Sequence, residues 1–235
     1  MIHQAKGKIF LADQRGLSET ASLRSMNTFN FGKYFNEHKQ AFGDLYVLND
    51  DTLAGGYSIK MLIEEDSCII LVPVVGAIKY TDTDGNDNII AAGQAQAVWL
   101  NKGCIMEITN PFSDQPVNFL QIWLRANKPK QSCGLRLSTY DDVNGNLNKL
   151  VNAFPMDAGI NILPCKLTIG KFSGRGETVY HPDGKTKGIF VFVIEGAFEV
   201  AGRLLHARDG LALWEAKAAE MEALSNDAII AVIEH

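Results

Sequence analysis

Short apolar segments separated by glycine-, asparagine- and aspartate-rich turns run through most of the chain, and a sustained helical period is hard to find. Short apolar runs bounded by such turns are typical of β-strands. Asp82–Asn86 (DTDGN) is a hairpin-turn signal between two of these runs. The pattern predicts an all-β protein. The predicted strands are Asp44–Asn49, Cys68–Val75, Ala77–Thr81, Ala95–Leu100, Cys104–Thr109, Val117–Leu124, Leu163–Phe172, Gly188–Glu195, Ala197–Val200, Gly210–Trp214 and Ala228–Ile233.

Two parts of the chain repeat the same order of features. Gly76-Ala77 opens a hairpin that leads on to Trp99, and Gly196-Ala197 opens one that leads on to Trp214. A spacing of 120 positions between the two starts indicates two similar β domains, because solenoid repeats run to ~20–50 residues. Coincidence is the alternative, since a Gly-Ala pair after a strand is common. We predict domains at 1–125 and 158–235, with a linker and interdomain segment at 126–157.

Composition excludes several classes of function. The 235 residues carry a net charge of −5, which disfavours direct binding to nucleic acid. The apolar runs fall short of the ~20 residues that a membrane helix needs, and the N-terminus has no signal-peptide pattern. Four well-separated cysteines without a CxxC motif argue against a zinc ribbon and fit a reduced, cytoplasmic setting.

Several motifs in the first half resemble those of pirin-like proteins. They occur in order along the chain: Thr28–Phe35 (TFNFGKYF), Phe42–Asp51 (FGDLYVLNDD), Gly76-Ala77, Asp84–Asn86 and Phe119–Leu124 (FLQIWL). The second half is more divergent, but its strand and turn spacing is similar to that of a second cupin domain. The resemblance implies a bicupin, which is a chain of two tandem jelly-roll β-barrels.

The resemblance also implies a metal in the N-terminal cupin, typically iron. Pirin-like proteins hold it with a His-x-His pair before the Gly-Ala hairpin and with a His and a Glu, two apart, on a later strand. Imidazole and carboxylate ligands suit Fe(II), Ni or Cu, and open positions allow oxygen chemistry. Some members are similar to quercetin dioxygenases, which oxidise flavonols.

This chain departs from that ligand pattern. Counting from Gly76 and Gly93 places the four ligand positions on Leu62, Glu64, Met106 and Ile108, and no histidine lies between His38 and His181. We therefore predict no metal cofactor in the N-terminal barrel, and a ligand pocket lined by those four residues. Glu64 has two interpretations. It belongs to a solvated acidic turn, or it is a lone carboxyl inside the barrel whose raised pKa suits it to acid–base work or ligand binding.

The remaining candidates are weaker. His181 and Asp183 precede the second Gly-Ala hairpin, where a cupin places its ligand pair, and they are either metal ligands or ordinary turn residues before and after Pro182. Cys133, in a polar stretch, is the thiol that we expect to be most exposed, and whether it senses redox state is left open.

These observations favour a bicupin that binds a small molecule in its N-terminal barrel, or another protein, without catalysis. The alternative is an enzyme, a quercetin 2,3-dioxygenase-like oxidoreductase with a non-standard metal site around His181. A third hypothesis is metal-free catalysis by Glu64. We expect no nucleic-acid or membrane partner.

Overall fold

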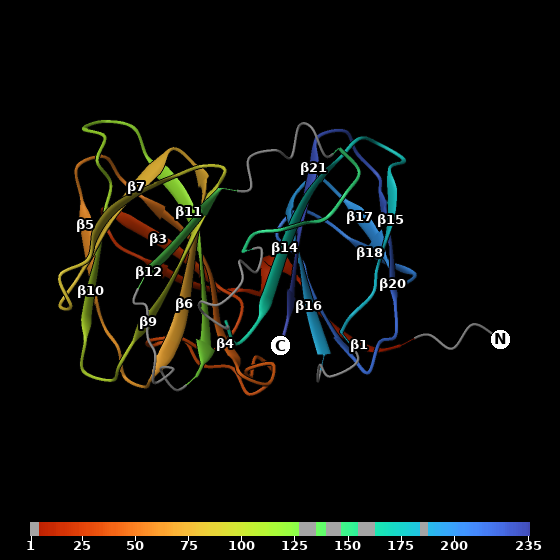
Figure 1. Cartoon of the computed structure of the whole chain (residues 1–235), viewed down its shortest axis with the longest axis horizontal. Helices are drawn as coiled ribbons and strands as arrows, with labels where there is room; N and C mark the ends of the chain where they lie inside the picture. The colour runs from red at the N-terminus through yellow and green to blue at the C-terminus, as the bar shows by residue number, and fades with distance from the viewer. Residues whose placement is uncertain (1–4, 127–134, 140–146, 155–162, 184–187) are drawn as a thin grey trace. The chain divides into compact units, whose positions relative to one another are not determined.

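The computed structural model describes residues 5–126, 135–139, 147–154, 163–183 and 188–235 (Figure 1). Within these ranges the chain forms β-strands and turns with one short 3-10 helix, η1 (Ala12–Gln14). The all-β prediction is therefore confirmed. None of the helices formed by these residues has the length and apolar character to cross a membrane.

The chain divides into two compact units. One, the N-terminal barrel, comprises residues 16–139 and 156–164, and the other, the C-terminal barrel, comprises 1–15, 140–155 and 165–235. Each consists of two antiparallel sheets whose strands are drawn in Figure 1. In both, alternate side chains of the strands point between the sheets and form an apolar core.

The N-terminal barrel pairs a seven-stranded sheet, in the order β12-β9-β6-β11-β4-β3-β2, with a four-stranded sheet, in the order β5-β10-β7-β8. Its strands are β2 (Gly16–Glu19), β3 (Leu23–Asn27), β4 (Leu45–Leu53), β5 (Ser58–Leu62), β6 (Ser67–Val75), β7 (Ala77–Asp82), β8 (Asp87–Ala91), β9 (Gln94–Leu100), β10 (Ile105–Thr109), β11 (Val117–Arg125) and β12 (Leu135–Thr139).

The C-terminal barrel pairs a six-stranded sheet, β1-β19-β16-β21-β14-β13, with a four-stranded sheet, β15-β20-β17-β18. Its strands are β1 (Lys6–Phe10), β13 (Val151–Asn152), β14 (Lys166–Phe172), β15 (Glu177–Tyr180), β16 (Gly188–Glu195), β17 (Phe198–Val200), β18 (Arg203–Leu205), β19 (Gly210–Trp214), β20 (Ala219–Ala223) and β21 (Ala228–Glu234).

The strand orders confirm the internal repeat. The order β9-β6-β11-β4 in one barrel corresponds to β19-β16-β21-β14 in the other, and β5-β10-β7-β8 corresponds to β15-β20-β17-β18. Gly76 and Gly196 occupy equivalent turns with φ angles of +80° and +77°. Because this left-handed region disfavours side chains with a Cβ atom, glycine suits both turns. Equivalent positions in the two barrels can therefore be compared directly.

The domain boundaries differ from the prediction at both ends of the first domain. β1, expected in the first domain, pairs with β19 of the C-terminal barrel. β12 and β13, expected in the linker segment 126–157, pair with β9 and β14 respectively. A strand pattern reveals that a segment needs a backbone partner, but it does not reveal which sheet edge supplies one.

A buried carboxylate fastens the start of the chain to the C-terminal barrel. Asp209, 3% exposed, accepts hydrogen bonds from the backbone N–H groups of Ala12, at 2.7 Å, and His206, at 2.8 Å. Without the Asp209 carboxylate, the backbone N–H groups of Ala12 and His206 lose their hydrogen-bond acceptor. A buried donor without an acceptor costs about 1–3 kcal/mol.

We predict that Asp209→Ala lowers the free energy of unfolding by about 2–4 kcal/mol, as measured by urea denaturation. The exposed Asp13→Ala variant is the control and should unfold at the wild-type midpoint. Equal midpoints for Asp209→Ala and wild type would show that these hydrogen bonds do not hold the segment in place.

Candidate binding site in the N-terminal barrel

A row of polar side chains crosses the interior of the seven-stranded sheet. Gln96 lies opposite Leu71, Leu71 opposite Gln121, Gln121 opposite Asn49, and Asn49 opposite Asn27. Residues opposite one another on paired strands point to the same face of a sheet. Asn27, Asn49, Gln96 and Gln121, which we call the polar row, are each 0–1% exposed.

The polar row faces the core of the barrel. The side chain of Asn49 points to the same face of β4 as those of Val47 and Leu53, which belong to the apolar core. The side chain of Gln121 points to the same face of β11 as those of the core residues Phe119 and Trp123. The row is thus a polar strip inside an otherwise apolar interior.

Asp51 adds a carboxyl group beside this row. Gln121 Nε2 donates to Asp51 Oδ2 at 2.5 Å, and Trp123 Nε1 donates to Gln121 Oε1 at 3.1 Å. Gln121 Nε2 also lies 3.6 Å from the Met61 sulfur, which comes from the opposite sheet. Gln121 therefore links the carboxyl group, the indole and the facing wall of the barrel.

Several polar atoms here have no hydrogen-bond partner among the described residues. They are both side-chain polar atoms of Asn49, Oδ1 of Asp51 and Nε2 of Gln96. A buried polar group without a partner costs about 1–3 kcal/mol, so native proteins normally satisfy such groups with protein, water or ligand. Two donor groups and two acceptor atoms are thus left without a partner among the described residues.

The equivalent row in the C-terminal barrel is mostly apolar. Leu211, Val191, Val232, Thr168 and Asn152 lie opposite one another there, at the positions of Gln96, Leu71, Gln121, Asn49 and Asn27. Val191 and Leu71 each lie five residues before the equivalent glycine. The same strand framework therefore packs with leucine and valine where the N-terminal barrel has glutamine, so the fold does not require glutamine at these two positions.

Two family models match this chain. The model described as Pirin matches residues 11–124, and the model described as the quercetinase C-terminal cupin domain matches residues 165–234. The chain belongs to the pirin-like bicupin family. Its two barrels are accordingly the N-terminal and C-terminal cupin domains of that family, as the motifs predicted.

Relatives and solved structures resemble this pirin-like chain over nearly its full length. Quercetin 2,3-dioxygenase from Escherichia coli is 22% identical over 219 residues, with 93% of this chain and 94% of the relative covered. A pirin-like protein from Caulobacter vibrioides is 26% identical over 228 residues, with 94% and 96% covered. The crystal structure of YhhW from Escherichia coli has a TM-score of 0.83 at 21% identity, with 97% of both chains covered.

A second structure of YhhW is described as bacterial pirin in complex with nickel(II). It has a TM-score of 0.78 at 19% identity, with 97% of this chain and 98% of that chain covered. At such identities the likeness shows the fold alone.

The structure does not assemble the predicted pocket of four residues. Met106 and Ile108 are buried in the N-terminal cupin, but Leu62 is 59% exposed and Glu64 is exposed. The prediction was one residue out of register on β5, where neighbouring side chains point to opposite faces. Met61 and Ile63 face the core instead.

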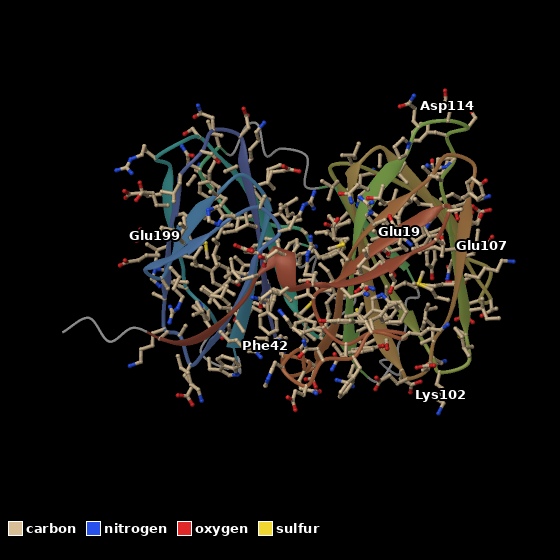
Figure 2. All side chains as sticks on the ribbon, turned by 180° about the vertical axis from the view of Figure 1, so that it is seen from behind. Glu19, Phe42, Lys102, Glu107, Asp114 and Glu199 are labelled. Atoms are coloured by element: carbon tan, nitrogen blue, oxygen red, sulfur yellow. The ribbon has the colours of Figure 1, made fainter. Side chains whose placement is uncertain are left out.

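Glu64 belongs to the acidic surface turn rather than to the barrel interior. With Glu65, Asp66, Lys102 and Arg125 it lines a surface hollow of about 440 Å³. The hypothesis that burial activates Glu64 as an acid or base is therefore wrong, because the side chain is in solvent. Figure 2 shows the neighbouring Lys102 projecting away from the ribbon.

The facing strands β5 and β10 present side chains without nitrogen or oxygen donors to the core. These are Ile59, Met61, Met106 and Ile108, and Met61 lies opposite Met106 in the strand register. This set does not fit an iron or nickel ion, which prefers imidazole and carboxylate ligands, although thioethers are ligands for Cu(I). Among the described residues, no group of three or more His, Cys, Asp or Glu side chains has a metal-binding arrangement.

In the C-terminal cupin, His181 and Asp183 follow β15 and are both exposed. The backbone N–H of Asp183 donates to Glu234 Oε1 at 2.5 Å, and the buried carboxyl of Glu234 also accepts a hydrogen bond from the hydroxyl of Tyr180. The carboxyl of Glu234 thus holds the turn that contains His181 in place.

The described cysteines are buried or half-buried. Cys68 and Cys165 are buried and Cys104 is half-buried, and burial raises the pKa of the Cys165 thiol to about 12. A thiol with so high a pKa is a poor nucleophile at neutral pH. Cys133 lies outside the described residues.

The polar row was missed at the sequence level, although a signal was present. Each of Asn49, Gln96 and Gln121 has an apolar core residue two positions away on its strand, namely Val47, Val98 and Phe119. A polar residue at a strand position that faces the core indicates a special role, because such positions are seldom polar without a partner.

Asp51 places a carboxyl group beside the polar row, and its pKa is raised to about 6. Burial is the main cause and the charge of Asp50 adds to it, whereas the neighbouring Ser25 hydroxyl and the hydrogen bond from Gln121 act in the opposite direction. The folded state therefore holds this proton more tightly than the unfolded chain, in which the pKa is near its ordinary value of 3.8.

The contribution of Asp51 to stability is greatest below its unfolded pKa and falls as the pH rises from 3.8 through about 6. We predict that the free energy of unfolding of Asp51→Asn, whose new side chain carries no charge, falls by up to about 3 kcal/mol less than that of the wild type over this pH range. The measurement is urea denaturation at intervals between pH 4 and pH 8. The exposed Asp114→Asn variant should show the same dependence of the free energy of unfolding on pH as the wild type (Figure 2). An unchanged pH dependence in Asp51→Asn would contradict the raised pKa of Asp51.

Proposed function

We propose that the N-terminal cupin of this pirin-like protein binds a small molecule without a first-row metal ion and without catalysing a reaction. The observation that carries the proposal is the set of buried, unpartnered polar atoms on Asn49, Asp51 and Gln96. Native proteins normally satisfy such buried groups with protein, water or a bound molecule.

The chemistry of the facing strands supports the metal-free part of the proposal. Ile59, Met61, Met106 and Ile108 supply no imidazole or carboxylate to the core, and the chain has no histidine between His38 and His181. A site with these side chains holds a hard or borderline divalent ion poorly.

The comparison between the two barrels supports the binding part. A polar row costs stability unless its atoms find partners, and the C-terminal barrel accepts apolar residues at the positions of Gln96 and Gln121. Retaining glutamine at these two positions makes sense where a bound molecule supplies missing hydrogen bonds. A protein partner and a cytoplasmic setting remain predictions from composition.

The alternative function is a quercetinase-like dioxygenase, favoured by relatives that are named as quercetin 2,3-dioxygenases. It needs a metal site around His181 or an unforeseen ligand set. His181 and Asp183 are both exposed, whereas catalytic metal sites usually lie in shielded pockets. We therefore keep this function as the second candidate.

The test is metal analysis and oxygen uptake on full-length protein produced with iron, nickel or copper supplied. We predict substoichiometric metal after dialysis and no oxygen uptake with quercetin. His181→Ala should match wild type in both measurements, as should His38→Ala, a control at an exposed histidine.

Near-stoichiometric metal that His181→Ala abolishes and His38→Ala retains would overturn the proposal and support the dioxygenase. Oxygen uptake with quercetin by the metal-loaded protein would do the same.

A further inference from the structure

We propose that the outer face of the sheet β15-β20-β17-β18, in the C-terminal barrel, is a docking surface for a lysine- or arginine-rich segment of another protein. This surface belongs to the other barrel from the polar row, so the inference does not depend on the proposed function. It is carried by carboxylates without ion-pair partners, by exposed apolar side chains and by a hollow, all on one face of this sheet.

Four glutamates point outward from three neighbouring strands of the sheet. Glu177 on β15 lies opposite Glu222 on β20, and Glu222 lies opposite Glu199 on β17. Glu220 is two residues from Glu222 and therefore points to the same side of β20. We call the surface formed by these four residues the acidic face, and Figure 2 labels Glu199 on the outside of the barrel.

The acidic face has an excess of negative charge. Glu222 pairs with the exposed Arg175 at 2.6 Å, whereas Glu177, Glu199 and Glu220 form no ion pair with any described residue. Like charges directly opposite one another on neighbouring strands destabilise a sheet. Positive side chains from a partner would replace this repulsion by attraction.

The equivalent face of the N-terminal barrel is not acidic. Lys79 and Glu199 are equivalent because each lies three residues after its glycine turn. Strand pairing then aligns Glu177, Glu222 and Glu199 with Ser58, Thr109 and Lys79. In that barrel Ser58 and Thr109 are hydrogen-bonded at 2.7 Å, and Lys79 pairs with Asp87 at 3.0 Å. The strand framework therefore does not require the three glutamates.

Exposed apolar side chains and a hollow accompany the carboxylates. Val179, opposite Glu220, is 47% exposed, and Leu204, opposite Glu199, is 52% exposed. Val179 and the four glutamates line a hollow of about 510 Å³. Protein interfaces combine apolar contacts with a polar rim, so this recess offers more than a charged surface.

The chemistry of the face selects the class of partner. Lysine and arginine side chains carry positive charge at the end of an apolar stem, so the charge can pair with Glu177 or Glu199 while the stem packs on Leu204. Nucleic acids and anionic membrane surfaces are repelled by the same carboxylates.

The spacing of the carboxylates favours a chain of cations over a single ion. Glu177 and Glu199 are separated by one strand, which places their backbones about 10 Å apart. Among the described residues, no group of acidic side chains has a metal-binding arrangement. A protein segment with several basic side chains can reach both ends of the row at once.

The N-terminal barrel supplies variants that test this inference. Glu199→Lys installs the residue found at the equivalent position, and Glu37→Lys makes the same change of charge at an exposed position of the other barrel. Leu204→Ser removes an apolar contact, and its control is Ile89→Ser at the equivalent exposed position. Because Glu199→Lys removes a like-charge pair, we expect it to unfold at or above the wild-type temperature.

The experiment is fluorescence anisotropy with full-length protein and a labelled lysine-rich peptide that has leucine at every third position. We expect the peptide to bind and its affinity to fall with added salt. Glu199→Lys should lose about tenfold or more in affinity, Leu204→Ser should lose less, and Glu37→Lys and Ile89→Ser should match wild type. The same peptide with glutamine in place of lysine should not bind.

The other outcomes overturn the inference in distinct ways. Equal losses in Glu199→Lys and Glu37→Lys would show that the peptide responds only to the overall charge of the protein. Spermine that binds as tightly as the peptide would assign the face to a small polyamine. Sedimentation showing wild-type self-association that Glu199→Lys abolishes would assign it to a second copy of this chain. If Glu199→Lys does not fold, Glu177→Ser, which installs the equivalent residue Ser58, decides by the same measurements. None of these results bears on metal-free binding in the N-terminal barrel.

Discussion

The in-register pairing of strands is the constraint on which the rest of this structure depends. Once β4, β6, β9 and β11 are hydrogen-bonded side by side, the alternation of side chains decides which residues meet inside the barrel. Asn49, Gln121 and Gln96 come from segments far apart in the sequence, yet the register places them in one row. The same alternation places Leu62 and Glu64 in solvent, one position away from the core-facing Met61 and Ile63.

The internal repeat separates what the fold needs from what it tolerates. Both barrels keep the glycine turn after the central strand and the same order of paired strands. They differ in the row of residues that crosses the larger sheet, which is polar in one barrel and mostly apolar in the other. Because buried polar atoms cost stability when they lack partners, the polar row is the basis of the proposed binding role.

Much of the fold could be predicted because strand signals are local. The apolar segments at Gly188–Glu195 and Gly210–Trp214 are strands with the predicted bounds, and the Gly76 and Gly196 turns mark the repeat. Weaker segments such as β1 and β13 were not predicted as strands, because their pairing depends on edges supplied from elsewhere in the chain. Of the four residues predicted to line a pocket, Met106 and Ile108 on β10 are buried, whereas Leu62 at the end of β5 is exposed because its side chain points to the opposite face.

The sequence by itself determined the all-β class, the two-domain repeat, the resemblance to pirin-like proteins and the lack of histidine between His38 and His181. Those properties follow from local patterns and from counting residues. Only the tertiary structure decided that the first strand completes the C-terminal barrel, that Glu64 is outside, and that Asn49, Asp51, Gln96 and Gln121 meet inside. The reason is physical: burial and hydrogen-bond partnership depend on contacts between distant segments, and a one-residue change of register reverses which face a side chain occupies.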